Sequence, residues 1–570
     1  VLCTASAWAA APAEDSRFRD HLAGLVDSGE IDFETGLVAR FQRVFAPADL
    51  PPELRSSGAW PDRSATLLLH EFSQIRETLS AATVTTIEDY LRLPSGSATQ
   101  SHVTTHFRLN YETTGAHAVD PADTAPANGI PDYVDRAAEY LETSWTRLID
   151  EAGFVAPLTS GGRLPVSFRD MASFGYTQDI NGLPHIVLHR SYSGFPANQD
   201  PEGSERGAAK VTAAHELKHA SQHATSGWTE GGWLEADATW AEDFVFDATN
   251  DYLRYLPLGS PVSHPDRWLD GGAASYEDCL WQHLISESFG AQALVDFFAR
   301  RAAVPSEPVV ATFDAMLQSY GSSLAAMRAE LGVWAYFSGA NATQRPVGFS
   351  EAASFPTPPL GAFATEPGET VSGQLDGFGT RYVFAGTNGR SGQPWIQFLG
   401  SRAAPFAVSA VAWSATGQSS LTRIPLTAAN SSSHEMDTDW ADIGSLILVV
   451  TNTGGASDDF FLTIDDRNAV SALTLAEDGF SLLPNYPNPF AEQTTIAFTV
   501  GAPGRVRLAI YDIGGRLVRR LIEGEPVEAG NHLRLWNGLD ERGRAAVPGV
   551  YYYRLETAER GATRKMLLLR

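Results

Sequence analysis

Cysteine and positive charge are both scarce in this chain. Its 570 residues include 2 cysteines, and 41 lysines and arginines stand against 68 aspartates and glutamates, for a formal net charge of −27. So few cysteines cannot build a disulfide framework or a cysteine-rich metal site. We expect Cys279, which lies in an apolar run, to be a buried thiol. The negative charge argues against nucleic acid and anionic membranes as partners.

The sequence also lacks an apolar run long enough to cross a bilayer, so we expect no membrane span. Residues 1–15 contain small residues of the kind found at the end of a signal peptide, although no basic segment precedes them. We expect this stretch to be a signal-peptide remnant and the protein to be secreted or held on the outer cell surface. The hydrophobic fraction of 43% is ample for packed cores, and the length suggests about three or four domains.

The segment His215 to His219, with sequence His-Glu-Leu-Lys-His, has the pattern of a metal site. Four residues advance about 6 Å along an α-helix, so both imidazoles project from one face and can bind one ion. Glu216 lies beside them, where it can act as general base on a water acidified by zinc. With 14 histidines in the chain, about 0.02 such matches are expected by chance. We therefore predict a zinc site.

Zinc in hydrolases usually has three protein ligands and one open position. Glu235 is the best candidate for the third ligand, because it lies on a second helical run after the turn at 227–232. Glu230 in that turn is a rival, and His223 continues the histidine face but lies about 12 Å beyond His215. The alternative to a metal site is a core helix whose two histidines only satisfy each other's hydrogen bonds.

The His-Glu-x-x-His run at 215–219 and the Trp-x-Glu-x-x-Ala-x-Trp-x-Glu run at 233–242 together resemble the glutamate-zincin metallopeptidases, the thermolysin-like clan. They resemble more closely a group of secreted bacterial metalloproteases. Motifs typical of that group also occur upstream, in the expected order, at 106–111, 128–134 and 174–176. The resemblance covers about residues 100–350. It implies that His215, His219 and Glu235 bind zinc and that Glu216 is the general base.

Two positions depart from the family pattern. The group usually has glycine directly after the third ligand, where this chain has Ala236. Thermolysin-like enzymes have aspartate four residues after that ligand, where this chain has Thr239. Side chains that hydrogen-bond to metal-bound histidines fix their orientation, so this support must come from elsewhere. Glu242 and Asp243 are the two candidates.

A zinc peptidase also needs a hydrogen-bond donor for the oxyanion that forms when water adds to the peptide. Tyr276 is our candidate, because it opens a run to Leu284 that can form a helix packed beside the site. A tyrosine next to apolar neighbours is also typical of a core position, which is the alternative for this residue. Other candidates for the donor are Tyr252, Tyr255, Arg267 and His283.

Two apolar runs before the zinc helix, 164–168 and 185–189, are bounded by glycine and proline and predict strands. The second is either an edge strand that pairs with an extended peptide substrate or an ordinary interior strand.

A loop with glycine and proline contains clustered acidic and amide side chains, at Asp120, Asp123, Asn128 and Asp132. Oxygen ligands of this kind bind Ca²⁺. Their spacing does not follow the calcium-loop pattern, so a solvated turn before a helix is the preferred interpretation and a Ca²⁺ site the weaker one.

The composition changes several times along the chain, which predicts a multidomain protein. Residues 16–98 are predicted to be helical, either as a propeptide that covers the cleft or as a fixed N-terminal subdomain. Residues 99–355 are predicted to form an α+β zincin-like catalytic domain. Beyond a proline-rich stretch, short alternating runs predict an all-β sandwich over 360–468.

Residues 476–570 form a last region with its own signature, Leu-Pro-Asn-Tyr-Pro-Asn-Pro-Phe at 483–490. Further motifs follow at 510–515, 536–538 and 549–553. Their order resembles the C-terminal immunoglobulin-like module, similar to that of the flagellar-hook-capping protein, which acts as a type IX secretion sorting domain. The resemblance implies export through the outer-membrane secretion machinery, and a simple stalk domain is the alternative.

These observations predict a secreted zinc metalloendopeptidase that hydrolyses peptide bonds in protein or peptide substrates. The main alternative is a catalytically inactive surface or adhesion protein with a zincin-like domain, for which Ala236 and Thr239 are the sequence hints. A third interpretation keeps zinc-dependent hydrolysis but changes the substrate to a glycan-linked or other non-peptide bond.

Overall fold

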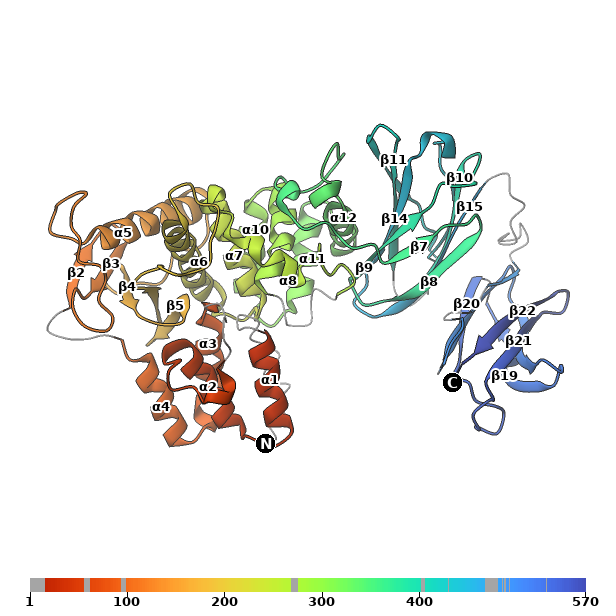
Figure 1. Ribbon diagram of the computed structural model, residues 1–570, viewed down its shortest axis with the longest axis horizontal. Helices are drawn as coiled ribbons and strands as arrows, with labels where there is room; N and C mark the ends of the chain where they lie inside the picture. The colour runs from red at the N-terminus through yellow and green to blue at the C-terminus, as the bar shows by residue number, and fades with distance from the viewer. Residues whose placement is uncertain are drawn as a thin grey trace. The chain divides into compact units, whose positions relative to one another are not determined.

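The computed structural model separates into two units. The first comprises Val1–Pro261 with Leu269–Leu324, and the second comprises Val262–Trp268 with Ala325–Arg570. Within them, the structure describes residues 16–55, 62–93, 99–267, 275–400, 405–428, 430–466, 480–483, 485, 488–491, 493–528 and 530–569. Helices dominate the first unit and strands the second, which confirms the predicted multidomain mixture of helices and several sheets (Figure 1).

The described residues of the first unit begin with a group of α-helices and one short strand. They are α1 (Ser16–Asp27), α2 (Phe33–Phe45), β1 (Asp62–Ser64), α3 (Thr66–Ile75) and α4 (Ala81–Leu91). Helix α2 begins after Asp32 and α4 after Ser80, and each of these side chains accepts a backbone N–H of the first turn. Phe41 and Phe72 pack edge to face between α2 and α3. The strand within this predicted helical region is a feature that the sequence did not indicate.

A six-stranded sheet follows, with the order β1-β5-β6-β4-β3-β2. The later strands are β2 (Gln100–Val103), β3 (Phe107–Tyr111), β4 (Leu164–Arg169), β5 (Ser173–Ile180) and β6 (Leu183–His189). The two predicted strands correspond to β4 and β6. Because β6 pairs with β4 on one side and with β5 in an antiparallel hairpin on the other, the interior-strand alternative for 185–189 holds and the edge-strand alternative does not.

Helices cover this sheet and carry the predicted site. The longer ones are α5 (Asp132–Trp145), α6 (Ser204–Ser226), α7 (Trp233–Val245), α9 (Leu280–Phe289), α10 (Gln292–Ala303) and α11 (Val309–Ser319). Helix α6 packs against β5 and β6 and lies beside α7 (Figure 1). It ends where Gly227 adopts φ 63°, a left-handed conformation that glycine reaches without strain. Buried Cys279 is a free thiol, as predicted.

Helix α12 (Leu324–Tyr336) groups with the second unit, although the sequence placed the end of the catalytic domain at 355. Its Tyr336 packs against Tyr382, and the Tyr382 hydroxyl donates to the Gly332 carbonyl at 2.8 Å. These contacts fix the helix on the face of a β-sheet.

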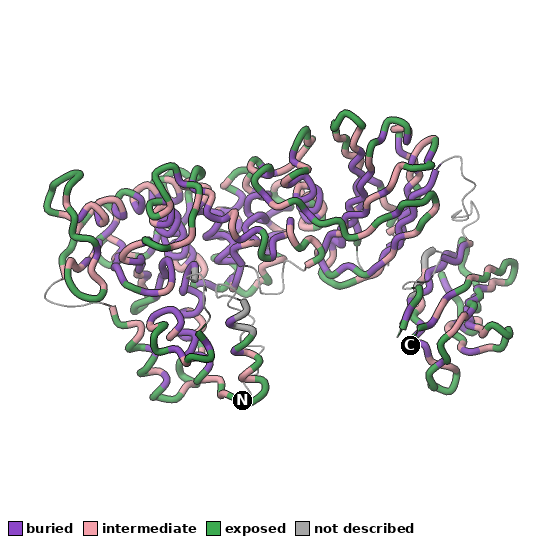
Figure 2. Tube along the Cα trace, viewed as in Figure 1, coloured by how far each residue is buried: buried purple, intermediate pink, exposed green. Residues whose placement is uncertain are grey.

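The second unit contains a sandwich of two sheets, with orders β13-β10-β15-β8 and β12-β11-β14-β9-β7. Its strands are β7 (Ala362–Ala364), β8 (Glu369–Leu375), β9 (Thr380–Ala385), β10 (Pro394–Gly400), β11 (Phe406–Trp413), β12 (Ser419–Ile424), β13 (Ser431–Glu435), β14 (Ser445–Asn452) and β15 (Asp458–Asp466). Side chains such as Phe398, Leu448 and Phe460 fill the space between the sheets. Figure 2 shows this buried interior along the central strands.

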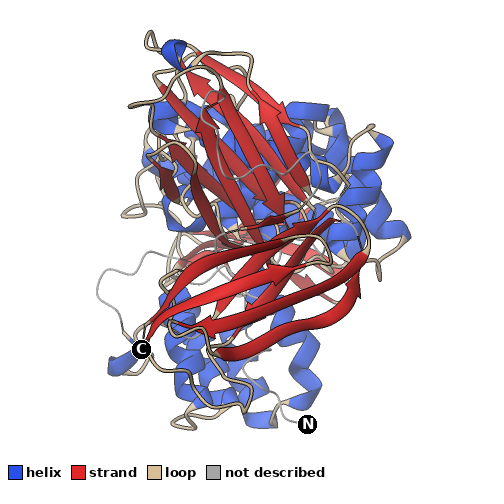
Figure 3. Cartoon of the chain, turned by 90° about the vertical axis from the view of Figure 1, so that its right-hand side faces the viewer, coloured by secondary structure: helices blue, strands red, loops and turns tan. Residues whose placement is uncertain are grey.

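In the described residues of the C-terminal region, the regular elements are β-strands (Figure 3). They are β16 (Ser481–Leu482), β17 (Thr494–Val500), β18 (Gly504–Asp512), β19 (Leu517–Val527), β20 (Gly530–Trp536), β21 (Gly549–Glu556) and β22 (Gly561–Leu568). They form sheets of order β16-β17-β20 and β19-β18-β21-β22, with Trp536 and Tyr553 buried between them. In the described part of the chain, no helix is both long and apolar enough for a membrane span.

Candidate metal centre

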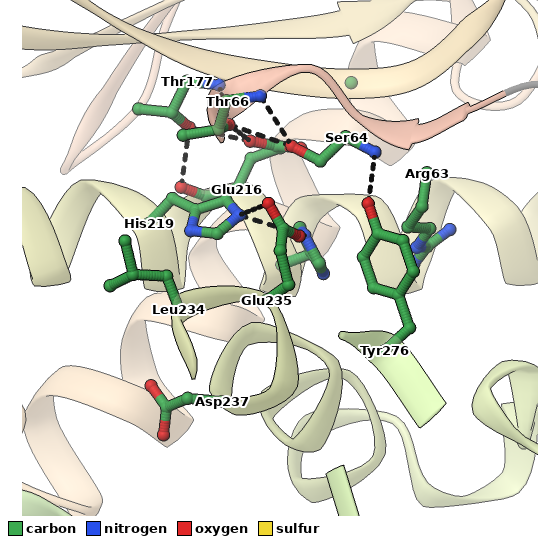
Figure 4. A network of polar contacts seen from close by, with 12 residues as sticks. Arg63, Ser64, Thr66, Thr177, Glu216, His219, Leu234, Glu235, Asp237 and Tyr276 are labelled. Atoms are coloured by element: carbon green, nitrogen blue, oxygen red, sulfur yellow. Dashed lines mark hydrogen bonds and ion pairs between the residues drawn. The ribbon is translucent and has the colours of Figure 1, made fainter. Parts of the chain in front are cut away.

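Two neighbouring helices bring the three predicted ligands together. His215 and His219 lie on α6, and Glu235 lies in the first turn of α7. Figure 4 shows His219 and Glu235 pointing toward each other. The Nε2 atoms of the two histidines lie 3.1 Å apart. Glu235 Oε2 lies 3.0 Å from His215 Nε2, and its Oε1 lies 3.5 Å from His219 Nε2. Within the described ranges, this is the one group of three or more such side chains whose ligand atoms all lie within 4.8 Å of one another.

This donor set fits a divalent zinc ion. Ligand atoms about 2.0–2.1 Å from a tetrahedral ion lie about 3.3 Å from one another, close to the separations of 3.0 to 3.5 Å in this cluster. All three side chains are buried. Glu235 Oε1 has no hydrogen-bond partner among the residues described, which is costly for a buried carboxylate. A bound cation would supply the missing partner.

Each histidine is held through its other ring nitrogen. Glu242 Oε1 lies 2.7 Å from His215 Nδ1, and Gln222 Oε1 lies 2.7 Å from His219 Nδ1. Contacts of this kind fix the ring orientation and leave Nε2 for a metal. Of the two candidates for this support, Glu242 contacts the histidine. Gln222 was missed, although it lies three residues after His219, at the spacing of side chains that meet on one helix face.

Glu242 also compensates for the departure from the family pattern at position 239. The Thr239 hydroxyl is buried and has no hydrogen-bond partner within the described residues. Glu242 lies about two helical turns beyond Glu235, so the two carboxylates share one face of α7 and contact opposite nitrogens of His215. The support for the histidine therefore comes from a later turn of the same helix.

The two other candidates for the third ligand, Glu230 and His223, form contacts away from the cluster. Glu230 accepts a hydrogen bond from Arg301 Nε at 2.8 Å. His223 Nε2 lies 2.7 Å from Asp179 Oδ2, and its ring packs edge to face on Trp228. Glu230 precedes α7 and His223 lies one turn beyond His219, so neither joins the cluster.

Glu216 lies on α6 directly beside the cluster (Figure 4). Its Oε2 accepts hydrogen bonds from the Thr177 hydroxyl at 2.9 Å and the Thr66 hydroxyl at 3.3 Å. Its Oε1 is buried and accepts no hydrogen bond from the described part of the chain. Burial raises the pKa of Glu216 above its ordinary value. One oxygen is thus held in place while the other is available to a ligand.

Tyr276 also lies at the site, in the short helix η7 (Tyr276–Cys279). Its ring centroid is 6.0 Å from that of His215, and its hydroxyl oxygen accepts the Ser64 N–H at 3.0 Å (Figure 4). The structure therefore brings the predicted oxyanion donor beside the cluster. Its neighbour Tyr255 accepts a hydrogen bond from Arg254 at 2.7 Å. The other two described candidates of this unit, Tyr252 and His283, stack on each other, and Arg267 belongs to the second unit.

Charge in the cluster is balanced between imidazoles and carboxylates. Burial opposes protonation of His215, but hydrogen bonds to Glu235 and Glu242 raise its pKa to about 9. Burial raises the pKa of Glu235, but the nearby His219 ring and the hydrogen bond with His215 outweigh burial and lower that pKa to about 2. A cluster that attracts a proton this strongly also attracts a metal cation, which competes with the proton for the same ring nitrogens.

The acidic loop near α5 uses its carboxylates to hold the backbone. Asp132 accepts the N–H groups of Thr124 and Ala125, and Asp123 accepts those of Asn128 and Gly129. These contacts match the turn interpretation. A Ca²⁺ site in this loop stays a prediction.

No protein-family model and no curated protein sequence matches this chain. Among solved structures, PorZ, a surface component of the type IX secretion system of Porphyromonas gingivalis, is 14% identical over 28% of this chain and 22% of that one, with a TM-score of 0.13. Latent PorU of the same organism is 17% identical over 37% and 19%, with a TM-score of 0.14. A Bacillus licheniformis lipase in its propeptide form is 12% identical over 68% and 86%, with a TM-score of 0.16. The chain spans about a fifth of the first two, and likenesses with TM-scores this low carry no weight for fold or function.

Proposed function

We propose that this chain is an exported zinc metallopeptidase of the glutamate-zincin kind. One observation carries the proposal: three buried ligand atoms converge within 4.8 Å, and a glutamate with an unpaired oxygen lies directly beside them. Zincin-like chemistry requires this combination of a three-ligand cluster and an adjacent general base.

His215, His219 and Glu235 are the residues that would hold the ion. When bound, zinc supplies Lewis acidity, which polarises a peptide carbonyl and lowers the pKa of water. Glu216 accepts a proton at Oε1, and its raised pKa makes it a stronger base than an exposed glutamate. Thr177 keeps the carboxylate oriented by holding Oε2. Tyr276 carries a phenolic O–H beside the cluster, which suits it to stabilise an oxyanion.

An extended peptide is the substrate that the surroundings favour. Strand β5 lies next to α6, and its outer edge pairs with another extended segment of the chain, β1. A strand edge of this kind binds peptides through main-chain hydrogen bonds, with little dependence on their sequence. We therefore propose that the peptide binds along the outer edge of β5 rather than along β6.

The test combines zinc content by elemental analysis with casein cleavage, measured on the same samples. We expect one zinc per chain in the wild type and in Glu216→Gln, and loss of zinc in Glu235→Ala. Cleavage should fall by about 10²–10⁴-fold in Glu216→Gln, because the general base is lost. Glu151→Ala, an exposed position, serves as the control and should change neither quantity.

The proposal would be contradicted by a folded chain that binds no zinc, or by casein cleavage that survives Glu216→Gln. A second candidate is the catalytically inactive surface protein. It is favoured by the contacts of Ser64 and Thr66, because the chain itself hydrogen-bonds to both Tyr276 and Glu216. It predicts a zinc-loaded chain that leaves casein and mixed peptides intact.

We also propose that residues 476–570 address the protein to an outer-membrane secretion machinery. The order of motifs in this region and its construction from two small sheets support an immunoglobulin-like module. In a bacterium with type IX secretion, the full chain should reach the medium or cell surface, and a chain that lacks this region should stay in the periplasm. Equal export of both would contradict the proposal.

A further inference from the structure

The outer edge of β5 is covered by a segment from the beginning of the chain. Strand β1 pairs parallel with β5, with Ser64 opposite Gly175. The Ala65 N–H donates to the Gly175 carbonyl at 3.2 Å, and the Thr177 N–H donates to the Thr66 hydroxyl at 2.9 Å. Residues 62–66 therefore satisfy the same backbone groups of β5 that would otherwise pair with an extended peptide.

Residues 62–66 also contact the proposed oxyanion donor, Tyr276, and the proposed general base, Glu216. The Ser64 N–H donates to the Tyr276 hydroxyl, and the Thr66 hydroxyl donates to Glu216 Oε2 (Figure 4). A main-chain donor at one group and a hydroxyl donor at the other are contacts that a bound substrate can also make. Residues 62–66 thus occupy hydrogen-bonding positions at both Tyr276 and Glu216.

One side chain of the segment, Arg63, is buried, and we call the residues around its guanidinium the Arg63 pocket. Arg63 is 2% exposed, and its guanidinium contacts Glu242 through Nε at 3.0 Å and Nη2 at 2.7 Å. Asp251 lies 3.5 Å from Nη1, and the guanidinium carbon lies 4.5 Å from the centre of the Phe174 ring. These walls belong to α7, the short helix η6 (Asp251–Arg254) and β5. Glu242, Asp251 and Phe174 all lie outside the N-terminal helices α1–α4.

The chemistry of this pocket matches a basic side chain. Paired Nε and Nη donors on one carboxylate are the preferred geometry of a guanidinium, and an aromatic face adds a cation–π contact. Arg254 neutralises Asp251 from the other side at 2.9 Å. Without Arg63, the contact with His215 would be the one polar contact left to Glu242 among the described residues, and the pocket would carry excess negative charge. A neutral or acidic side chain would leave that charge unpaired.

We propose that the pocket around Arg63 is the substrate subsite for a basic side chain, and that residues 62–66 are its resident occupant, which an incoming extended peptide displaces. This inference rests on the proposed peptidase function and adds a substrate class to it: peptides with arginine or lysine near the cleaved bond. It differs from a permanent ion pair, which would never exchange with a second chain.

The test uses the zinc-loaded full chain and fluorescent hexapeptides that carry arginine, norleucine or glutamate at one position. Wild type, Arg63→Ala and Arg76→Ala are compared by fluorescence anisotropy and by peptide cleavage, with zinc content measured alongside. Arg76 is a matched control, because it forms an exposed ion pair with Glu88 in the same N-terminal region. A further variant, Arg63→Ala/Asp251→Asn, keeps the pocket open but removes one of its charges.

Arg63→Ala should bind the arginine peptide about 10- to 100-fold more tightly than the norleucine peptide, as expected for a hydrogen bond between charged groups. Wild type and Arg76→Ala should bind it at least about tenfold more weakly than Arg63→Ala, because the occupant competes. The double variant should lose most of the charge preference. In the wild type, saturating arginine peptide should also speed hydrogen exchange in the chain segment 62–69.

Equal binding of the three peptides by folded Arg63→Ala would overturn the subsite. If that variant does not fold, the wild-type exchange measurement decides: no faster exchange at millimolar peptide would show that the segment does not exchange with a ligand. Charge-selective binding without cleavage would contradict the proposed peptidase function and support the proposed subsite. Cleavage without charge preference would remove the subsite and leave the peptidase.

Discussion

The interior between helices α6 and α7 and the interior of the β-sandwich β7–β15 have opposite chemical character. Between the helices the interior is charged, with His215, Glu235 and Glu242 each no more than 1% exposed. Between the sheets it is apolar, with residues such as Phe460 and Leu448 fully buried. Burial stabilises the apolar core directly, whereas a buried charge costs free energy unless it is paired. The apolar core therefore stabilises the sandwich directly, whereas the buried charges of the helix pair need a partner, which in our proposal is a cation.

The largest expected effect concerns the apolar core between the two sheets of the sandwich. Phe460→Ala should lower the free energy of opening of the sandwich by about 3–5 kcal/mol, because it leaves a cavity between the sheets. Region-resolved hydrogen exchange of β14 and β15 measures the loss. Phe363→Ala is the control, since Phe363 is 56% exposed in the same sandwich and should change opening little. Zinc content should stay the same in both variants, and its loss in Phe460→Ala would break the comparison.

Removing zinc should have the next largest effect, on the helix pair alone. A ligand present at 100 times its Kd stabilises the folded state by about 2.7 kcal/mol, so chelation should speed hydrogen exchange in α6 and α7 by about 100-fold. Peptides from β14 and β15 should be unchanged. Equal protection of α6 and α7 with and without chelator would show that the charged cluster needs no cation. The measurement requires only the wild-type chain.

A smaller effect is expected from Glu242→Gln. The amide keeps a hydrogen bond to His215 Nδ1 but loses the charge that makes the imidazole a better ligand, so zinc affinity should fall about 10- to 100-fold. Competition with a coloured chelator measures it. Asp243→Asn is the control, because the neighbouring Asp243 carboxylate lies 4.0 Å from Nδ1 of a different histidine, His283. Equal affinities of the two variants would mean that Glu242 is not the residue that supports the site.

The sequence predicted the part of the site that lies within single helices. His215, Glu216 and His219 follow from one helical repeat, and Glu235 from the next helix. Gln222 was accessible by the same reasoning, because it lies three residues after His219 and contacts it. These residues share one property: their spacing along the chain fixes their spacing in space.

Contacts between distant segments could not be predicted in this way. Strand β1 has three residues, too few for an alternating pattern, and its contact with Tyr276 joins residues 212 positions apart. The order of strands in a sheet likewise depends on which hairpins form, so the sequence did not decide whether β6 or β5 lies nearer the edge. Helix α12 groups with the second unit because it packs on the β-sandwich, which its sequence as an ordinary helix does not indicate.

The smallest expected effect contrasts the buried His215 with the partly buried His185, both in the first unit. Carboxylates raise the pKa of His215, whereas burial alone lowers the pKa of His185 in β6 to about 4 from its ordinary value of 6.5. Between pH 6.5 and about pH 4, the unfolded chain binds a proton at His185 that the folded chain does not bind. The free energy of unfolding therefore falls as the pH decreases through this range. From pH 7 to pH 5.5 the loss should be about 1 kcal/mol, measured by exchange in β6 after correction for intrinsic rates. His185→Gln should remove that share of the pH dependence, and an unchanged slope would show that His185 does not titrate differently on folding.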